Sequence, residues 1–297
     1  MKRALKKLRL VQPFNYVATS AVRGVLRATG WHSEFIIKHL HRAGTVKCRL
    51  PNGRMLTLWS RADDWVSNQV YWRGWTGYEP ETAPLFFRAA TRARVTMDVG
   101  AYVGFYTLLA AHANPCGQVY AFEPLPQPFE RLCRNVSLNR LSNVHCVNSA
   151  AGEVDDVAEL FYAATTMPTN SSLSAQFVQG APQVCSRRVP IIRLDSFVQT
   201  NGIDCVDLIK VDTESSEPSV LRGAIEALRR HHPMIFCEVL PGCGTEAPLE
   251  QILRPLGYRY YLLTPDGPVW HQYIEGHPQW LNYLFTTLTP EAVAGLR

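Results

Sequence analysis

The sequence predicts an α/β protein with a Rossmann-like, mostly parallel, seven-stranded sheet and helices on both faces. Two observations carry this expectation. From residue 94 onward, short apolar runs alternate with segments of helical length, a pattern that indicates parallel strands joined by helical crossovers. The run from Val95 to Tyr106 also passes from an apolar strand through Gly100 and Gly104 into a helix. This strand, glycine turn and helix are typical of the first unit of a nucleotide-binding sheet.

The chain of 297 residues is 46% hydrophobic, with a net charge of +5, which suits a folded protein rather than a disordered one. We divide it into 1–92, a basic helical arm with a hairpin and an aromatic cap, and 93–297, the sheet domain. The arm carries unopposed cations at Lys2, Arg3, Lys6, Lys7, Arg9, Arg23 and Arg27. It suits a solvated helix, or a weak peripheral membrane contact with Leu5, Leu8, Leu10 and Val11 on one face. A short, solitary basic stretch does not lead us to expect nucleic acid, and we expect no secretory signal and no membrane span.

The rest of the N-terminal part predicts a hairpin and an irregular aromatic segment. Pro51-Asn52-Gly53 is a turn sequence between strands at 45–50 and 54–59. The stretch 71–79 is broken by glycines, so we expect no regular element there. Its aromatic side chains could form a packing collar over the sheet edge or a substrate lid, with Glu79 as the polar residue of interest.

The sheet domain divides into elements by the same alternation. The polar excursion at 153–192 contains strand-like runs at 158–162 and 188–193. The other elements expected are strands at 95–99, 118–123, 143–149, 206–212, 234–240, 258–263 and 280–287, and helices at 103–113, 126–139, after Asp195, 217–231 and 247–255. Right-handed crossovers place the residues that follow the parallel strands at one edge of the sheet.

A nucleoside cofactor is predicted at that edge. Glu123 ends the second strand about 25 residues after Asp98, where a carboxylate binds ribose hydroxyls. The spacing Gly100-x-x-x-Gly104 departs from the dinucleotide pattern, and Asp98 beside the turn would repel a pyrophosphate but suit a cationic ligand. S-adenosylmethionine fits best, a dehydrogenase cofactor remains an alternative, and the glycines could also serve the turn alone. The expected cofactor-binding residues are Asp98, Gly100, Ala101, Tyr102, Gly104, Tyr106, Glu123 and, at the adenine edge, Ser149.

Several sequence blocks together resemble the FkbM family of S-adenosylmethionine-dependent methyltransferases. They are Asp-Val-Gly-Ala-x-Val-Gly-Phe-Tyr-Thr from Asp98, Val-Tyr-Ala-Phe-Glu-Pro ending at Pro124, Arg134-Asn135-x-x-x-Asn139, Leu194-Asp195-Ser196-Phe197, the 207–214 block, Leu221-Arg222-Gly223-Ala224, Phe236-Cys237-Glu238-Val239 and Leu256-Gly257-Tyr258. The resemblance covers roughly residues 76–286 and implies the class I methyltransferase fold, with an antiparallel last strand. It has two departures: the family usually has Asn at the position of Tyr102 and Gly at that of Ser215.

Carboxylates after the fourth and fifth strands are the candidate catalytic residues. Asp212 and Glu214 follow the strand next to the one that carries Asp98, so we expect them to orient a methyl acceptor or accept its proton. Glu214 could instead complement a helix dipole, with Ser216 as the N-cap. Lys210 is placed to pair with Asp212, and Glu238 could reach the acceptor pocket or satisfy Lys210. We predict no metal, because no ligand spacing demands one.

The eight cysteines contain no C-x-x-C pair, which predicts buried free thiols, a reducing cytoplasm and no zinc site.

The resemblance implies methylation of a hydroxyl on a sugar, glycan or polyketide-like small molecule. Two alternatives stay open. The basic arm would suit an RNA or protein methyltransferase, although no Asn-Pro-Pro-Tyr-type motif follows the fourth strand. Tyr102 and Ser215 would suit a fold that has lost its chemistry and only binds.

Overall fold

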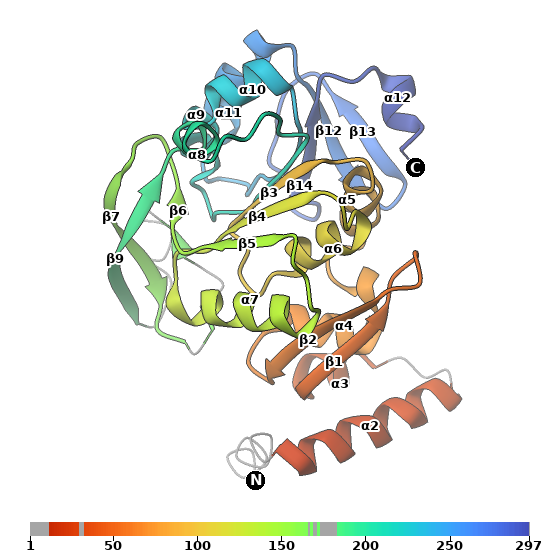
Figure 1. Ribbon diagram of the computed structural model, residues 1–297. Coiled ribbons are helices and arrows are strands. Elements are labelled where there is room, and N and C mark those ends of the chain that lie inside the picture. The colour runs from red at the N-terminus through yellow and green to blue at the C-terminus, as the bar shows by residue number, and fades with distance from the viewer. Residues whose placement is uncertain (1–11, 30–32, 166, 169–170, 173–182, 297) are drawn as a thin grey trace.

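The protein is built around an eight-stranded sheet in the order β13-β12-β14-β11-β10-β3-β4-β5 (Figure 1). The structure is a computed structural model that describes residues 12–29, 33–165, 167–168, 171–172 and 183–296. The strands are β3 (Val95–Val99), β4 (Gln118–Phe122), β5 (Val144–Val147), β10 (Leu208–Val211), β11 (Met234–Glu238), β12 (Arg259–Thr264), β13 (Gly267–His271) and β14 (Asn282–Thr286). The predicted α/β class is confirmed.

The topology matches the expected one, with one strand more. Strands β5, β4, β3, β10 and β11 are parallel to one another. Strand β14 lies antiparallel between β11 and β12, as the resemblance implied. The prediction of seven strands is wrong by one, because β13 pairs antiparallel with β12 at the edge of the sheet. The parallel order places the ends of β3, β4 and β10 side by side, and the candidate site lies there.

Each face of the sheet is covered by its own helices. Alternate strand residues point to opposite faces, so Leu208 belongs to one hydrophobic cluster and Ile209 to the other. The first cluster includes α5 (Ala83–Ala90), α6 (Phe105–Ala113), α7 (Pro126–Leu138) and Val293 of α12 (Pro290–Ala294). The second includes α8 (Leu194–Thr200), α9 (Glu217–Arg222), α10 (Ile225–His231) and α11 (Glu246–Leu253), which leads through the 3-10 turn η2 (Arg254–Leu256) into β12.

The helix predicted at 217–231 is two helices. α9 ends at Gly223, and a Cβ on Gly223 would lie 1.9 Å from the carbonyl oxygen of Gly152. Asp195 of α8 then accepts a hydrogen bond from the backbone N–H of Ala227 at 2.9 Å, in the first turn of α10. The break is therefore stabilised by residues distant in sequence.

The polar excursion forms a second sheet, in the order β6-β9-β7-β8. Its strands are β6 (Ala150–Ala151), β7 (Asp156–Ala163), β8 (Ser171–Ser172) and β9 (Val184–Ile192). β7 contains the predicted run at 158–162, and β9 covers all but the last residue of the run at 188–193. Leu160, Val189 and Ile191 pack against Leu125 and Ala150, which attaches this sheet beside the end of β4.

The predicted hairpin is confirmed as β1 (Ala43–Arg49) and β2 (Met55–Arg61), which pair antiparallel. Two asparagines of the Arg-Asn-x-x-x-Asn block fix it to α7. The Oδ1 of Asn135 accepts from the N–H of Trp59 at 2.8 Å, and that of Asn139 accepts from the N–H of Thr57 at 2.9 Å. These amides satisfy the free edge of β2. The division at residue 92 stays a prediction.

The aromatic segment is more regular than expected. α4 (Trp65–Arg73) begins where Asp64 accepts from the N–H of Ser67 at 2.6 Å and ends at Gly74, which has a positive φ of 83°. The prediction of no regular element at 71–79 is therefore wrong for 71–73. The 3-10 turn η1 (Trp75–Gly77) follows. Tyr71 and Phe86 are buried, as the packing interpretation requires.

The basic arm contains α2 (Gln12–Thr29), followed by α3 (Glu34–His39). The predicted apolar face of Leu5, Leu8, Leu10 and Val11 lies outside the described residues. Among the described helices, none combines the length and apolarity needed to cross a membrane. All eight cysteines are free, but only Cys48 and Cys237 are buried, while Cys116 and Cys243 are exposed. The expectation of buried thiols is thus wrong for most of them.

Candidate active site

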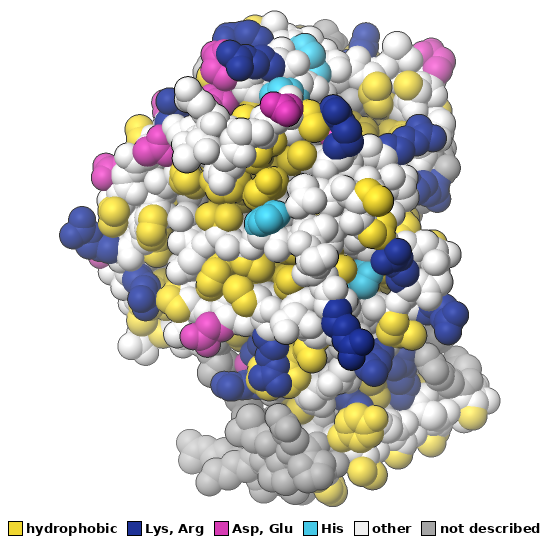
Figure 2. Space-filling view, viewed as in Figure 1, with side chains coloured by type: hydrophobic (Ala, Val, Ile, Leu, Met, Phe, Trp, Pro, Cys, Tyr) yellow, Lys and Arg dark blue, Asp and Glu magenta, His cyan; other side chains and the backbone are white. Residues whose placement is uncertain are grey.

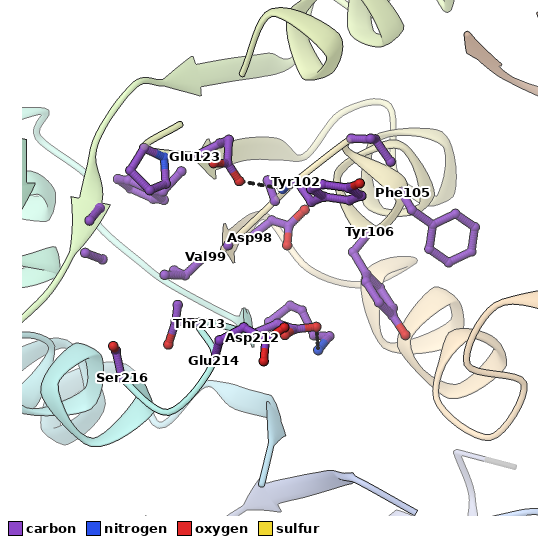
Figure 3. A pocket seen from close by; sticks show the side chains of 18 of the residues that line it. Asp98, Val99, Tyr102, Phe105, Tyr106, Glu123, Asp212, Thr213, Glu214 and Ser216 are labelled. Carbon is purple, nitrogen blue, oxygen red and sulfur yellow. Dashed lines mark hydrogen bonds and ion pairs between the residues drawn. The ribbon is translucent and has the colours of Figure 1, made fainter. Parts of the chain in front are cut away.

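A cavity of about 340 Å³ opens where the carboxyl ends of β3, β4 and β10 meet (Figure 3). It brings together residues from five segments that are far apart in the sequence. They include Trp65, Val66 and Tyr78 of the aromatic segment, Asp98, Gly100, Ala101, Tyr102 and Tyr106 around the first turn, Glu123 and Pro124 after β4, Ser149 and Ala150 after β5, and Lys210, Asp212, Thr213, Glu214 and Ser216 around the end of β10. All predicted site residues except Gly104 and Glu238 line this cavity.

The glycine turn is held tightly between its neighbours. Gly100 has a φ of +84°, and a Cβ on it would lie 1.8 Å from the carbonyl oxygen of Asp212. The N–H groups of Gly100 and Ala101 both donate to the carbonyl oxygen of Phe122 at 3.0 Å. Only glycine allows this conformation together with this approach. The predicted cofactor turn and the predicted catalytic segment are therefore in direct backbone contact.

Gly104 serves the structure from outside the cavity. It is the N-cap of α6 with a φ of +85°, and a Cβ on it would lie 2.6 Å from Cδ1 of Leu132. The positive φ is what favours glycine here, since the end of the Leu132 side chain can shift.

Glu123 is a buried carboxylate that organises the turn. Its Oε2 accepts from the N–H of Tyr102 and its Oε1 from the N–H of Leu125, each at 2.9 Å. Asn148 donates to the carbonyl oxygen of Glu123 at 2.8 Å and so fixes the residue before Pro124. Burial raises the pKa of Glu123 to about 7, although the two N–H donors oppose this. In Figure 3 the Glu123 side chain lies beside Tyr102 at the cavity wall.

Asp98 is the second buried carboxylate in the first half of the cavity, the half formed by the ends of β3 and β4. Its Oδ2 accepts from the hydroxyl of Thr107 on α6 at 2.5 Å. Burial raises the pKa of Asp98 to about 6, opposed by the Thr107 hydrogen bond and by the charge of Lys210. Among the described residues, no cation forms an ion pair with Asp98 or Glu123. Their ionised forms therefore give this half of the cavity a negative charge.

Lys210 is fully buried at the centre of the other half. Its Nζ donates to Oδ2 of Asp212 at 3.1 Å and to Oδ1 of Asn282 at 3.2 Å, and it lies 5.1 Å from the ring centroid of Tyr106. Burial acts to lower the pKa of Lys210, but nearby carboxylates, first among them Asp212, raise it above its usual value. The predicted pair of Lys210 with Asp212 is confirmed.

Glu214 lies two residues beyond Asp212 and faces the same cavity (Figure 3). Burial raises its pKa to about 8, and the charges of Asp212 and Glu217 add to the increase. Ser216 is the N-cap of α9, but it makes no side-chain capping hydrogen bond. Instead Glu217 accepts from both the N–H and the hydroxyl of Thr213 at 2.9 Å, so Glu217 is the residue that fixes this turn.

Glu79 belongs to the site more closely than the sequence indicated. It is half-buried, and its Oε2 accepts from the hydroxyl of Tyr106 at 2.5 Å and from Nδ2 of Asn282 at 3.1 Å. Burial raises the pKa of Glu79, while Lys210 acts to lower it. Asn282 carries no signal in the sequence, because a lone asparagine at the start of a strand belongs to no motif.

Glu238 does not line the cavity. It ends β11, where its Oε2 is buried without a hydrogen-bond partner among the described residues. Burial and the charges of Asp212 and Glu214 raise its pKa, so its carboxyl is protonated at neutral pH. No group of acids, histidines or cysteines among the described residues is arranged to hold a metal ion.

The two departures from the family pattern share a backbone property. Tyr102 has a φ of +50° and Ser215 a φ of +78°, in the left-handed region. Asn and Gly adopt this region far more readily than Tyr and Ser. Asn and Gly would thus suit the backbone found here, and Tyr102 and Ser215 adopt it under strain.

Comparison with known proteins agrees with this geometry. Residues 98–260 match the model of the methyltransferase FkbM domain. "Methyltransferase 1" of Beauveria bassiana is 28% identical over 189 residues, which are 57% of this chain and 74% of that protein. The "31-O-demethyl-FK506 methyltransferase FkbM" of Streptomyces tacrolimicus is 25% identical over 198 residues, 59% of this chain and 75% of that protein.

A solved methyltransferase FkbM from Methylobacillus flagellatus KT aligns with 75% of this chain at 18% identity and a TM-score of 0.44. This chain covers 55% of that structure, about half its length. The family match spans more than half of the present sequence and includes Asp98, Glu123 and Asp212. The chain belongs to the FkbM family of methyltransferases.

Proposed function

We propose that this methyltransferase takes its methyl group from S-adenosylmethionine and transfers it to a hydroxyl of a sugar, glycan or polyketide-like small molecule. The observation that carries the proposal is the shared cavity. Asp98 and Glu123 line one part of it and Asp212 and Glu214 another, so a nucleoside donor and a hydroxyl acceptor fit side by side.

The residues of the first half suit a cationic nucleoside better than a dinucleotide. Asp98 and Glu123 are carboxylates, and Lys210 is already paired with Asp212. A pyrophosphate would meet negative charge here, whereas an ammonium group near Asp98 and ribose hydroxyls near Glu123 find hydrogen-bond acceptors. When bound, S-adenosylmethionine supplies an electrophilic methyl group on a sulfonium. The tight turn at Gly100, with Ala101 and Tyr102 beside it, would hold the methionine portion, and Ser149 would lie at the adenine edge.

The second half of the cavity can orient and deprotonate a hydroxyl. Lys210 fixes Asp212 through Oδ2, and the other carboxylate oxygen can accept a hydrogen bond from the acceptor hydroxyl. Glu214, with its pKa raised to about 8, is close to the optimum for a base that takes up a proton near neutral pH. Glu238 does not line the cavity, and we assign it no direct part in the transfer.

The acceptor class rests on the relatives and on the aromatic wall. The Streptomyces tacrolimicus relative is named for 31-O-demethyl-FK506, a molecule that lacks a methyl group on an oxygen. Trp65 and Tyr78 offer flat apolar faces at the cavity, on which a sugar ring or macrocycle can pack. The free cysteines support a reducing, cytoplasmic location as part of this proposal.

The proposal is tested by methyl transfer from radiolabelled S-adenosylmethionine to a panel of hydroxylated glycans and polyketides, with tRNA and a peptide mixture alongside. We expect label in a hydroxylated small molecule, reduced at least about a hundredfold in Asp212→Asn. Asp204→Asn is the matched control, because Asp204 is exposed and lies outside the cavity. Label in tRNA or peptide alone would contradict the hydroxyl acceptor and favour an RNA or protein methyltransferase. Donor binding without any transfer would favour a fold that only binds.

A further inference from the structure

Charge is distributed very unevenly along this chain. Residues 1–61 contain 13 Lys and Arg against one acid, Glu34, whereas residues 62–297 contain 17 against 24 acids. Figure 2 shows basic side chains gathered above α2 in the lower half of the molecule, while most visible acids lie in the upper half. The stretch 1–61 is therefore strongly cationic, and the remainder of the sequence is anionic.

Helix α2 packs with its polar side against the segment at the start of β1. Asn15 and Thr19 are buried. The side chain of Asn15 donates to the carbonyl oxygen of His41 at 2.9 Å and accepts from the N–H of Ala43 at 2.7 Å. The hydroxyl of Thr19 accepts from Nη1 of Arg42 at 2.7 Å. This reverses the usual arrangement, in which a surface helix buries its apolar face.

The opposite side of α2 is apolar and exposed to solvent. Phe14, Val17 and Val25 are each more than half exposed, and Ala21 and Ala28 are also exposed. The spacing of these five residues, 3, 4, 4 and 3, forms one stripe along the helix. Exposure of a continuous apolar stripe is unfavourable in water, which indicates that another apolar surface covers it.

A basic groove of about 710 Å³ lies between the polar side of α2 and the hairpin. Arg23, Arg42 and Lys47 line it, together with the hydroxyl-bearing residues Tyr16, Ser20, Thr45, Thr57 and Tyr71. Arg42 is 4% exposed, and its Nε has no hydrogen-bond partner among the described residues. Its Nη1 donates only to oxygens of Tyr16, Thr19 and Ser20, and no carboxylate of the described residues forms an ion pair with it. The guanidinium lies over the rings of Tyr16 and Tyr71 and has no carboxylate partner among the described residues, so an anion in the groove would be favourable.

We propose that α2 docks this protein on an anionic phospholipid membrane, with the apolar stripe in the acyl-chain boundary and lipid phosphates at the basic groove. An interfacial helix of this kind needs an apolar face, flanking cations and an anionic headgroup layer. A second copy of the chain would cover the stripe, but it would bring two strongly cationic ends together. RNA would neutralise the cations and leave the stripe exposed. Only the membrane satisfies both features.

The test is cosedimentation of the full chain with phosphatidylcholine vesicles that contain none or about one third phosphatidylserine. We expect binding to the anionic vesicles only, weakened by salt. The double variant Val17→Asp/Val25→Asp should lose at least about tenfold in vesicle partitioning. Val154→Asp is the matched control, since Val154 is 54% exposed away from α2 and should bind as before. Equal loss in the control, or no loss in the double variant, would overturn the proposal.

The groove is tested by Lys47→Glu against Arg188→Glu, two charge reversals at exposed residues. We expect at least about fivefold weaker vesicle binding for the first only. Binding of inorganic phosphate without vesicle binding would overturn the proposal in favour of a soluble anion. A dimer in sedimentation velocity that the double variant dissociates, without vesicle binding, would overturn it in favour of self-association. S-adenosylhomocysteine affinity should stay unchanged in all these variants, which separates this proposal from the proposed function.

Discussion

Replacing Gly100 by alanine should separate the cofactor turn from the catalytic segment. The new Cβ would lie 1.8 Å from the carbonyl oxygen of Asp212, while ordinary contact begins at 3.4 Å, so the two backbones must move apart by about 1.6 Å. Alanine at this positive φ costs about 1–2 kcal/mol. The movement also weakens the 3.0 Å hydrogen bond from the N–H of Asp212 to Val99, at about 1 kcal/mol. We therefore expect a loss of about 2–3 kcal/mol in the free energy of unfolding.

Gly202→Ala is the matched control. Gly202 also has a positive φ, +62°, but a Cβ on it would meet nothing within 4 Å. Urea unfolding should show only the backbone cost of about 1–2 kcal/mol in this variant. Calorimetric titration with S-adenosylhomocysteine should show wild-type affinity for it and at least about tenfold weaker binding for Gly100→Ala. Equal stability and equal affinity in the two variants would refute the direct contact between the turn and the catalytic segment.

Three further predictions concern charge and backbone strain. Because the pKa of Glu123 is raised to about 7 and the ionised form accepts hydroxyl hydrogen bonds, S-adenosylhomocysteine affinity should rise by up to about tenfold from pH 6 to pH 8. A pH-independent affinity in calorimetry would contradict this. Because the pKa of Glu214 is raised to about 8 and only the ionised form accepts a proton, the methyl-transfer rate should rise between about pH 7 and pH 9. Glu214→Gln should flatten that profile, and an unchanged slope in the variant would exclude Glu214 as the base. Ser215→Gly should raise the free energy of unfolding by about 0.5–1 kcal/mol, because it relieves a φ of +78°, and an unchanged or lower urea midpoint would argue against strain there.

Much of the fold follows from local patterns, and the exceptions have physical reasons. Strands β3, β10 and β11 are mostly apolar runs that are buried on both faces, and β4 is buried on one face and partly on the other. Such runs are readily identified. Strand β13 has no such pattern, since Val269 and Trp270 are exposed and only the pairing with β12 defines it. The break at Gly223 depends on the backbone of Gly152, which no local pattern reveals.

The site was predictable where acids end apolar strands. Glu123 and Asp212 are predicted in this way, because a carboxylate at the end of a buried strand needs a partner. Asp98 is predicted from its place beside the glycine turn. The contact of Glu79 with Tyr106 and Asn282 joins segments up to 203 residues apart, and sequence spacing cannot show it. Glu238 lies at a strand end as predicted, but its side chain does not line the cavity.

Binding of S-adenosylhomocysteine to wild type and Glu123→Gln, measured by calorimetric titration with NAD as a control ligand, tests the central claim most directly. We predict micromolar binding of S-adenosylhomocysteine, no binding of NAD, and at least about tenfold loss of affinity in Glu123→Gln. Glu130→Gln, at an exposed residue of α7, should bind like wild type. Binding of NAD instead, or equal affinity in Glu123→Gln and wild type, would contradict the assignment of this cavity to S-adenosylmethionine.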